Sequence, residues 1–345
     1  MKTIHVHASK CYNVMIGSDL LEDLGSLLST VCKQTGKAAI ISDSNVWPLY
    51  GDIVSKSLAD SGYQVMHYVF PAGEASKNAE TYLNILNFLA ENKVTRSDLL
   101  IALGGGVVGD MSGFAAATYL RGVSYVQVPT TLLAMVDSSV GGKTAINLPA
   151  GKNLVGAFNQ PHLVLCDINT LNSLPEDVFR DGCAEVIKYG VIYDKNLFAH
   201  LAEKGPDFDR EAVIARCVEL KRDVVAQDEF DTGARQMLNY GHTIGHGIEA
   251  QSSFTITHGQ AVAIGMAIVA KSACPAIYDE LTQVLTEFGL PTTTTFTAEQ
   301  LYTSALSDKK RAGGSVNLII PTAIGSCNIV PTDVSKLKLF IEEGL

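Results

Sequence analysis

Short apolar runs alternate with stretches of helical spacing through the first half of the chain. Four runs have the length and composition of buried strands, at 37–42, 63–70, 98–103 and 123–128. Apolar residues at helical spacing occur from about Val46, at 79–91 and at 107–120. Strands that alternate with helices predict a parallel sheet covered on both faces. The segments near His5 and Met15 alternate more and predict an antiparallel edge.

The pattern changes after about Leu174. Helical periodicity then dominates, at 175–189, 211–226, 237–250, 261–274 and 279–288. Two later β-rich segments, 315–320 and 327–330, predict a small hairpin. We therefore expect an α/β protein of two domains, a parallel-sheet domain at 1–174 and a mostly helical domain at 175–345.

Composition narrows the class of protein. The 345 residues are 47% hydrophobic and 18% charged, which provides apolar material for two cores. The net charge is -10 and no long basic run occurs, so we expect neither nucleic acid nor membrane as a partner. No apolar run approaches the roughly 20 residues of a membrane span. Seven cysteines without a CxxC pair indicate reduced thiols and a cytoplasmic protein.

A glycine-rich turn, GGGVVGD at 104–110, follows a predicted strand and opens a helix. Its backbone can approach a pyrophosphate at the positive end of the helix, although a tight turn without a ligand fits the letters equally well. In the common dinucleotide fold the acidic ribose partner lies about 20 residues downstream. The best candidate here, Asp43, lies upstream at the end of the first buried strand. Asp43 fits either a nucleotide site or a helix N-cap.

Three of the eight histidines fall close together in the second half. His242 and His246 would share one helix face, and His258 begins the next helical stretch. Glu185 is a carboxylate on an otherwise apolar helix face. Two histidines with one carboxylate form a common open site for catalytic zinc, so this set favours a metal over core histidines. The spacing leaves open whether His242 and His246 both bind, or whether one histidine is a proton donor beside the metal.

Several cations recur beside glycines and metal-ligand candidates in this acidic chain. They are Lys143, Lys152, Lys188, Lys221 and Arg235. Lys188 follows Glu185 by three residues, so both would lie on one helix face. The set favours an anionic substrate, although any one lysine alone is more simply a solvated surface charge. The segment PAGEASK at 71–77 is, by itself, a polar turn with a surface Glu and Lys.

Eight segments together carry a specific signature. They are PAGEASK at 71–77, GGGVVGD at 104–110, PTTLLAMVDSSVGGKTAIN at 129–147, GKN at 151–153, AEVIKYG at 184–190, LNYGHTIGHGIEA at 238–250, HGQAVAIGM at 258–266 and DKKRAGG at 308–314. In order and spacing they resemble 3-dehydroquinate synthases along almost the whole chain. The resemblance implies a Rossmann-like nucleotide domain, a mostly helical metal domain, and an active site between them. It also implies a homodimer in which Arg121 reaches into the neighbouring subunit's site.

The resemblance also implies roles for individual residues. A divalent metal, zinc or cobalt, would be bound by Glu185, His242 and His258. NAD would be held by Asp43, Asn45, Glu74, Lys77, Gly105, Gly106, Val107, Asp110, Thr130, Thr131, Lys143, Lys152, Thr170 and Ser173. Substrate would meet Arg121, Asp137, Lys143, Asn153, Lys188, Lys221, Arg235, Asn239 and one of Lys309 and Lys310. His246 would hydrogen-bond substrate or phosphate without binding the metal.

The implied substrate is a phosphorylated sugar acid, 3-deoxy-D-arabino-heptulosonate 7-phosphate, and the implied product is 3-dehydroquinate of the shikimate pathway. A hydride would pass from C5 to NAD, the new ketone would acidify the C6 proton, and phosphate would leave by β-elimination. The hydride would then return, the ring would open, and an intramolecular aldol would close the carbocycle. NAD is regenerated each turn, while the metal serves as Lewis acid and template.

Four positions depart from the family pattern. Asp231 and Gln260 stand where Glu is usual, Ser173 stands where Thr is usual, and Asp177 stands where Arg is usual. The shorter side chain of Asp231 would weaken a contact behind the site, while Gln260 is an exchange that we expect to be tolerated. None of the four is a metal-ligand candidate or a substrate cation, so we expect the activity to be retained.

Three other functions compete with this one. A sister sugar phosphate cyclase, making an inosose or a valiolone, would share the NAD and metal motifs, but Lys221, Arg235 and Asn239 favour a carboxylate-bearing substrate. A metal-dependent polyol dehydrogenase would release NADH and would not need phosphate-binding lysines. A non-catalytic NAD-binding regulator would have no use for the set of Glu185 and two histidines.

Overall fold

The computed structural model describes residues 1–31, 36–253, 255–309 and 314–345, which form two compact units. Unit 1 comprises Met1–Leu174 and Arg210–Phe230, and unit 2 comprises Pro175–Asp209 and Asp231–Leu345. The chain first passes from unit 1 to unit 2 between residues 174 and 175, which is where the pattern of the sequence changes. A division of the chain at this point alone would, however, assign α7 (Arg210–Gln227) to unit 2. Helix α7 belongs to unit 1 because it packs against the first two strands of the sheet.

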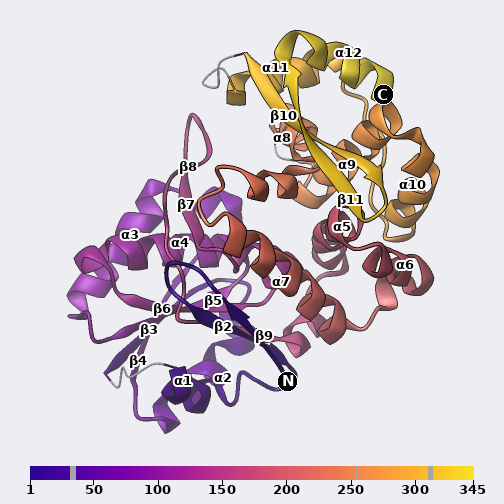
Figure 1. Ribbon diagram of the computed structural model, residues 1–345. Helices are drawn as coiled ribbons and strands as arrows, with labels where there is room; N and C mark the ends of the chain where they lie inside the picture. Colours follow the sequence, from indigo (N-terminus) through magenta and orange to yellow (C-terminus); the bar gives the residue numbers. More distant parts are fainter. Residues whose placement is uncertain (32–35, 254, 310–313) are drawn as a thin grey trace. The chain divides into compact units, whose positions relative to one another are not determined.

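Unit 1 is built on a seven-stranded sheet with the order β1-β2-β9-β6-β5-β3-β4 (Figure 1). The strands are β1 (Lys2–Val6), β2 (Tyr12–Gly17), β3 (Lys37–Asp43), β4 (Gln64–Phe70), β5 (Leu99–Gly104), β6 (Ser124–Pro129) and β9 (Leu163–Asp167). Every neighbouring pair is parallel except β1 with β2. The predicted parallel sheet and its antiparallel edge are confirmed, while β9 is a strand that the pattern analysis did not identify.

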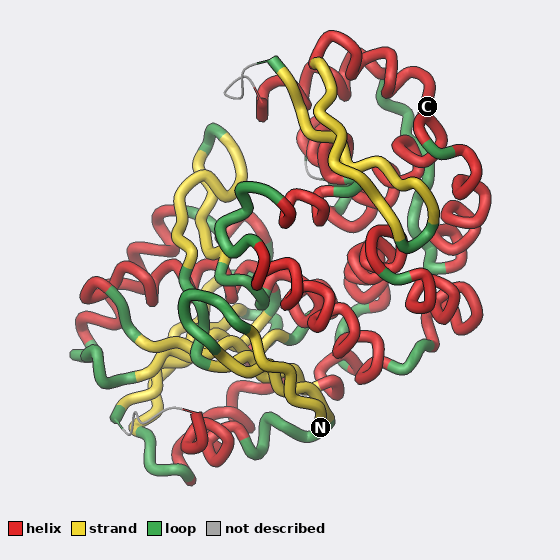
Figure 2. Tube along the Cα trace, viewed as in Figure 1, coloured by secondary structure: helices red, strands yellow, loops and turns green. Residues whose placement is uncertain are grey.

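Side chains of the central strands alternate between two apolar cores, as the period of two in a strand requires. Ala38 and Ile40 face a core shared with α1 (Leu24–Val31) and α2 (Trp47–Asp60). Ala39 and Ile41 face the other core, shared with α3 (Ala79–Glu91) and α4 (Gly106–Thr118). The sheet is therefore covered on both faces, as predicted, and Figure 2 shows helices alternating with its strands.

The remaining elements of unit 1 are short. A two-stranded antiparallel hairpin, β7 (Lys143–Leu148) with β8 (Gly151–Phe158), packs against α4 through β7. The short helical turns are η1 (Glu74–Ser76), η2 (Tyr119–Arg121), η3 (Ala134–Ser138) and η4 (Ile168–Asn172). The sequence pattern indicated this hairpin only as a glycine-rich stretch, because β8 contains two glycines and is mostly exposed, so it lacks a buried apolar run.

Unit 2 is mostly helical, as predicted (Figure 2). Its helices are α5 (Glu176–Tyr193), α6 (Lys195–Lys204), α8 (His242–Gln251), α9 (His258–Ala273), α10 (Tyr278–Glu287), α11 (Ala298–Lys309) and α12 (Val334–Gly344), with short turns η5 (Gly205–Asp207), η6 (Ala234–Asn239) and η7 (Pro275–Ile277). Strands β10 (Ser315–Ala323) and β11 (Ser326–Asp333) form the predicted hairpin. Within the described ranges, no helix is long and apolar enough to cross a membrane.

One helix prediction for unit 2 is wrong. The periodic stretch 237–250 is not a continuous helix, because η6 ends at Asn239 and α8 begins again at His242. Gly241 between them has φ 77, a left-handed conformation that glycine adopts without a Cβ penalty. This break decides where the first histidine of the cluster lies.

Candidate functional site

Three ligand-type side chains meet inside unit 2. Glu185 of α5 is 1% exposed, and its Oε1 lies 3.4 Å from Nε2 of His242 and 3.5 Å from Nε2 of His258. Zinc bonded to nitrogen and oxygen at about 2.0–2.2 Å in a tetrahedron separates its ligand atoms by roughly 3.3–3.6 Å. Glu185 Oε1 already has this spacing to both nitrogens, and all three ligand atoms lie within 4.8 Å of one another, so the cluster fits a divalent cation.

Both histidines stand at the first position of a helix. Gly241 sets the start of α8 at His242. A capping box sets the start of α9 at His258, because the side chains of Thr257 and Gln260 each accept from the other residue's backbone N–H. Helix α9 packs against both α8 and α5, so two helix starts meet the carboxylate on α5.

Close packing of α9 on α5 depends on glycine at position 259. A Cβ there would lie 2.0 Å from the backbone oxygen of Asp181, closer than any real contact. The Asp181 carboxylate also accepts from the backbone N–H of Gln260 at 3.1 Å and from the hydroxyl of Thr257. The first turn of α9, and with it His258, is therefore anchored to the helix that carries Glu185.

Hydrogen bonds at the second ring nitrogens orient both imidazoles. Nδ1 of His242 lies 3.0 Å from the backbone oxygen of Tyr240, and Nδ1 of His258 lies 3.2 Å from Oε2 of Glu249. Both partners only accept, so each Nδ1 donates, and a ring that is neutral directs the lone pair of its Nε2 toward Glu185. Ligands of metals in proteins are oriented by second contacts of this kind.

The two histidines differ in charge. Burial lowers the pKa of His242 to about 3, and Lys188 adds to the effect, so this imidazole is neutral. Burial also opposes a charge on His258, but the hydrogen bonds that its ring donates to Glu185 and Glu249 outweigh this effect and raise the pKa of His258 to about 10. Two carboxylates thus favour positive charge between these side chains, which a divalent cation would supply with the ring deprotonated.

Lys188 and His246 complete this region of unit 2. Nζ of Lys188 pairs with Oε2 of Glu185 along one face of α5, as the spacing predicted, and both residues are almost fully buried. His246 lies one turn after His242 and is exposed, with ring centroids 5.5 Å apart. The structure groups His242 with His258 around Glu185, while His246 falls in a group with Glu249 and His258.

The glycine turn of unit 1 lies at a reversal of strand order. Strand β3 pairs with β5, yet β4 continues on one side of β3 and β6 on the far side of β5. Open α/β sheets bind ligands beyond the carboxyl ends of the strands at such a switch point. Asp43 ends β3 and Gly104 ends β5, so the structure shows the expected neighbouring strand ends.

The carboxylate of Asp43 caps the turn that precedes α2. Its Oδ1 accepts from the backbone N–H of Asn45 at 2.9 Å and of Val46 at 3.0 Å. The prediction of a helix N-cap is therefore wrong, because the N-cap of α2 is Val46 and Asp43 caps the turn before it. At the neighbouring strand end Gly105 is the N-cap of α4, and the next two residues, Gly106 and Val107, begin its first turn.

A buried polar network lies beside this turn. Nζ of Lys77 contacts Oδ2 of Asp110 on α4 and Oδ1 of Asn153 on β8, each at 2.5 Å. Burial raises the pKa of Asp110, and Lys77 opposes the shift. The prediction of a surface lysine at the end of the 71–77 turn is wrong, since Lys77 is only 4% exposed and a buried charge needs such a partner.

Asn147 joins the members of this network and was missed as a candidate. Its Nδ2 donates to Oε1 of Glu74 at 2.7 Å, and its Oδ1 accepts from the backbone N–H of Asn153 at 2.9 Å. Its own N–H donates to the backbone oxygen of Lys77 at 2.8 Å. A single Asn near the end of an unrecognised strand has no pattern that would single it out.

Three predicted site residues, Asp110, Lys143 and Asn153, line a groove of about 460 Å³ in unit 1. The groove is lined by Asp110, Lys143, Thr144, Ala145, Asn153, Leu154, Gly156, Ala157 and Phe158. The first strand of its hairpin packs on α4, the helix that begins at the glycine turn. The groove therefore includes two of the predicted nucleotide residues, Asp110 and Lys143.

Two of the predicted substrate residues pair with each other in unit 1. Nζ of Lys221 on α7 lies 2.8 Å from Oδ1 of Asp137 and also donates to the backbone oxygen of Asp137. Lys221 is 4% exposed and is therefore not a solvated surface charge. In unit 2, Arg235 is 2% exposed on η6, whereas Asn239 at the end of η6 is exposed.

The other predicted residues lie at the ends of elements. Thr130 and Thr131 follow β6, and Lys152 lies on β8. Thr170 lies in η4 with Ser173 just after it, and the hydroxyl of Tyr50 contacts both residues. Lys310 lies outside the described residues, and Lys309 is the last residue of α11.

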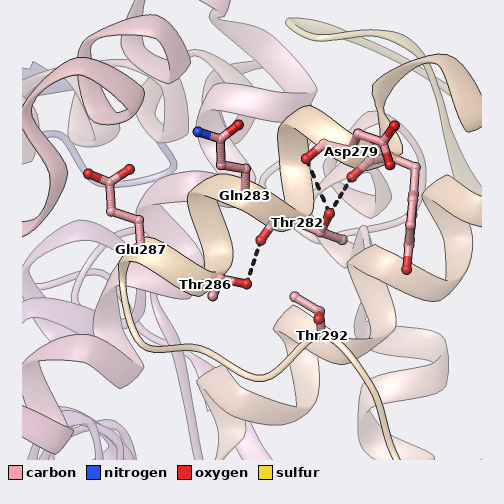
Figure 3. Close-up of a pocket in the computed structure, with 7 residues that line it drawn as sticks. Asp279, Thr282, Gln283, Thr286, Glu287 and Thr292 are labelled. Atoms are coloured by element: carbon pink, nitrogen blue, oxygen red, sulfur yellow. Dashed lines mark hydrogen bonds between the residues drawn. The ribbon is translucent and has the colours of Figure 1, made fainter.

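A depression on α10 in unit 2 has a different character (Figure 3). It measures about 560 Å³ and is lined by Tyr278, Asp279, Thr282, Gln283, Thr286, Glu287 and Thr292. The hydroxyls of Thr282 and Thr286 donate to backbone oxygens of their own helix at 2.8 and 2.7 Å. None of the clustered histidines lines it, so it is not the candidate site.

Local structure accounts for the departures from the family pattern. Gln260 serves the capping box through its Oε1, 3.3 Å from the N–H of Thr257, a role that Glu and Gln share. Asp177 lies in the first turn of α5, where the helix dipole favours an acid. Asp231 has φ 58, a conformation that Asp tolerates better than most residues. Ser173 keeps the hydroxyl that contacts Tyr50.

Solved structures with this fold include two sugar phosphate cyclases. One is 2-deoxy-scyllo-inosose synthase with carbaglucose-6-phosphate, NAD+ and Co2+, at TM-score 0.88 and 26% identity over 100% of both chains. The other is ValA, the 2-epi-5-epi-valiolone synthase of Streptomyces hygroscopicus subsp. jinggangensis 5008, with NAD+ and Zn2+ bound. Its TM-score is 0.88 at 26% identity, over 96% of this chain and 95% of that one.

Sequence comparison is more specific. The 3-dehydroquinate synthase of Rippkaea orientalis (strain PCC 8801 / RF-1) is 46% identical over 343 residues, covering 94% of this chain and 93% of that protein. Two family models match consecutive segments, 3-dehydroquinate synthase N-terminal at residues 67–181 and 3-dehydroquinate synthase C-terminal at residues 182–311. With both halves matched in order, the chain belongs to the 3-dehydroquinate synthase family.

Proposed function

We propose that this chain converts 3-deoxy-D-arabino-heptulosonate 7-phosphate to 3-dehydroquinate and phosphate, as a carbon–oxygen lyase that needs NAD+ and a divalent metal. The observation that carries the proposal is the cluster of Glu185, His242 and His258, whose donor spacing suits zinc or cobalt. Its support comes from the curated relative of this activity and from cyclase structures that hold NAD+ with Co2+ or Zn2+.

The cofactor residues divide between the units. In unit 2, Glu185, His242 and His258 would hold the metal. In unit 1, NAD+ would bind at the strand ends that carry Asp43 and Gly105, where the start of α4 offers backbone N–H groups to a pyrophosphate. When bound, NAD+ would take up and return a hydride while the metal polarises the oxygen of the carbon being oxidised.

The chain's own residues bind and orient the substrate. Lys188 is buried beside Glu185, so its ammonium would donate to substrate oxygens at a fixed place. In unit 1, Lys221 is held by Asp137, and Lys143 lines the groove with Asn153. These cations would neutralise the carboxylate and phosphate of a substrate that the acidic chain as a whole repels.

We also propose that the enzyme works as a homodimer, with Arg121 presented to a second copy. Arg121 is exposed on a turn in which Leu120, Arg121 and Gly122 all have positive φ, at 50°, 65° and 123°. The turn is supported by Arg96, which donates to the backbone oxygen of Leu120 at 2.9 and 2.7 Å. The exposed guanidinium of Arg121, on a turn fixed in this way, is therefore accessible to a second copy of the chain.

The first experiment measures phosphate release from the heptulosonate phosphate, with and without added NAD+, before and after chelator treatment. Free NADH is followed by its absorbance in the same samples. We expect phosphate release that needs the metal and no net NADH, because a recycled cofactor returns its hydride. Steady NADH without phosphate would instead identify a polyol dehydrogenase. No reaction by a protein that retains metal and NAD+ would identify a cyclase for another sugar.

A further inference from the structure

A second cluster of metal-type donors lies on the surface of unit 1, at the β1–β2 hairpin. One ligand atom each from His5, His7 and Cys11 falls within 4.8 Å of the other two, and all three residues are exposed. Nδ1 of His7 is 3.9 Å from Sγ of Cys11. The rings of His5 and His7 stand edge to face with centroids 4.6 Å apart. The cluster is far in sequence from the catalytic candidates and plays no part in the proposed reaction.

The pairing register of the hairpin brings these side chains together. His5 pairs with Asn13, and Val6 pairs with Tyr12. Continuing the register by one residue places His7 opposite Cys11. Alternate residues of a strand share a face, so His5 and His7 point to the same side as Cys11 and Asn13.

The opposite face of the hairpin holds this register in place. Ile4, Val6, Tyr12 and Val14 are all buried, between 0% and 6% exposed. A slip by one residue would expose these apolar side chains and bury the histidines, at a cost of about 2 kcal/mol for each large side chain exposed. Folding therefore fixes the three donor residues as neighbours on one face of the hairpin.

Asn13 orients one of the imidazoles. Its Oδ1 lies 2.8 Å from Nδ1 of His5. Because an amide oxygen only accepts, Nδ1 of His5 carries the proton and its Nε2 is the nitrogen with a lone pair for a ligand. Histidines that bind metals are oriented by the same kind of contact at the second nitrogen.

The turn between the two strands is also tied down within unit 1. The backbone N–H and hydroxyl of Ser9 donate to the carboxylate of Glu229 at 2.7 and 2.6 Å. Nζ of Lys10 donates to Nδ1 of His162 at 2.5 Å. A turn held at two points loses little conformational freedom when a ligand binds, which favours binding.

We propose that His5, His7 and Cys11 form a second, surface site for a divalent cation of the zinc type. Two imidazoles and a thiolate suit borderline-soft cations such as Zn2+ and Co2+, with water in the fourth position. Bonds of about 2.3 Å to sulfur and 2.0–2.1 Å to nitrogen place a tetrahedral S···N pair roughly 3.5 Å apart, so the observed 3.9 Å needs only a small side-chain rotation. As the sulfur–metal bond forms, the thiol proton passes to solvent, so binding strengthens as pH rises.

Cobalt titration of the full-length reduced protein tests the site. Thiolate-to-cobalt charge transfer gives near-ultraviolet absorption, and the cluster of Glu185, His242 and His258 contains no sulfur. We expect the absorption to appear on adding Co2+, to be reversed by Zn2+, and to be absent in Cys11→Ser. Cys274→Ser is the matched control and should titrate as the wild type does.

The histidine variants distinguish a built site from a reactive thiol. His5→Ala and His7→Ala should each weaken cobalt binding at least tenfold, and Asn13→Ala should weaken it roughly tenfold through the ring it orients. Phosphate release should be unchanged in all of them, which shows that the variants fold. The proposal would be overturned if no sulfur–cobalt absorption appeared, or if this absorption persisted in Cys11→Ser. Equal cobalt affinity in a variant that carries both His5→Ala and His7→Ala would also overturn it.

Discussion

The two donor clusters of this chain use similar side chains but arise in different ways. The helical cluster of Glu185, His242 and His258 is brought together by the packing of α5, α8 and α9, and its carboxylate is 1% exposed. The hairpin cluster of His5, His7 and Cys11 arises from one strand register and is exposed. Packing can enclose donors in a site that excludes water, whereas a register only aligns them on a surface.

Burial also changes what each cluster requires. Glu185 and Glu249 are buried, and Lys188 is the nearby cation. The two carboxylates raise the pKa of His258 to about 10, although its burial alone would lower this pKa. Buried carboxylates are costly without compensating charge. The exposed hairpin donors are solvated by water when no metal is bound. We therefore expect the helical cluster to retain its metal far more tightly than the hairpin.

The largest effect should come from removing a ligand of the helical cluster. The test uses a Cys11→Ser background, which removes the proposed metal site on the hairpin. In that background His242→Ala should lose both its metal and all measurable turnover. Lys188→Ala should also lose turnover but keep its metal, because in the proposed function Lys188 binds the substrate and is not a metal ligand. Elemental analysis after dialysis and the phosphate assay measure the two properties. A full complement of metal in His242→Ala would show that the ligand assignment is wrong.

A smaller effect should follow from changing the residue behind a ligand. Glu249→Gln keeps an oxygen that accepts from Nδ1 of His258 but removes the charge, so metal affinity should fall roughly 10- to 100-fold. Competition with a chromogenic chelator measures the affinity. Glu342→Gln, an exposed change on α12, is the control. Equal affinity in the two variants would contradict the view that burial makes the helical cluster depend on neighbouring charge.

The anchor of the hairpin should respond to pH. Burial lowers the pKa of His162 to about 4, with Lys10 adding repulsion, from an unfolded value of 6.5. Between these values the unfolded chain binds a proton that the folded chain does not, so stability should fall as pH drops from 6.5 toward 4.

The slope is at most about 1.4 kcal/mol per pH unit, and partial exposure of the ring should reduce it. Denaturant unfolding across this pH range measures the effect. His162→Gln should remove this part of the dependence. If the free energy of unfolding of His162→Gln depended on pH as that of the wild type does, His162 would titrate alike in the folded and unfolded states. The proposed role of His162 as an anchor of the hairpin turn would then be wrong.

The smallest effect is expected at the start of α9. Gln260→Glu restores the residue usual in the family and should change the free energy of unfolding by no more than about 0.5 kcal/mol, since either side chain completes the capping box. Gln260→Ala should cost about 1 kcal/mol because one backbone N–H loses its partner. Thermal unfolding of both variants measures the difference. A large gain in the free energy of unfolding of Gln260→Glu would show that the charge of the glutamate near His258 matters more than the capping hydrogen bond.

Much of the fold followed from pattern alone. The strands at 37–42, 63–70, 98–103 and 123–128 lie within about one residue of β3, β4, β5 and β6, because long buried strands are strongly periodic. The hairpin of β7 and β8 was not predicted, since the mostly exposed, glycine-containing strand β8 carries a weak signal. Helix α7 lies in the helical half of the sequence but packs with unit 1, which local periodicity does not encode.

For the site, the sequence by itself determined the residue types, the glycine turn, and the position of Lys188 on the same helix face as Glu185. It also determined the donor face of the β1–β2 hairpin, because register follows from the alternation of buried residues. Tertiary structure alone decided that His242 meets His258 at Glu185, and that Asn147 and Glu249 stand behind the candidate residues. The physical reason is that periodicity specifies which face of an element is buried, whereas only the packing of close helices specifies which side chains face each other there.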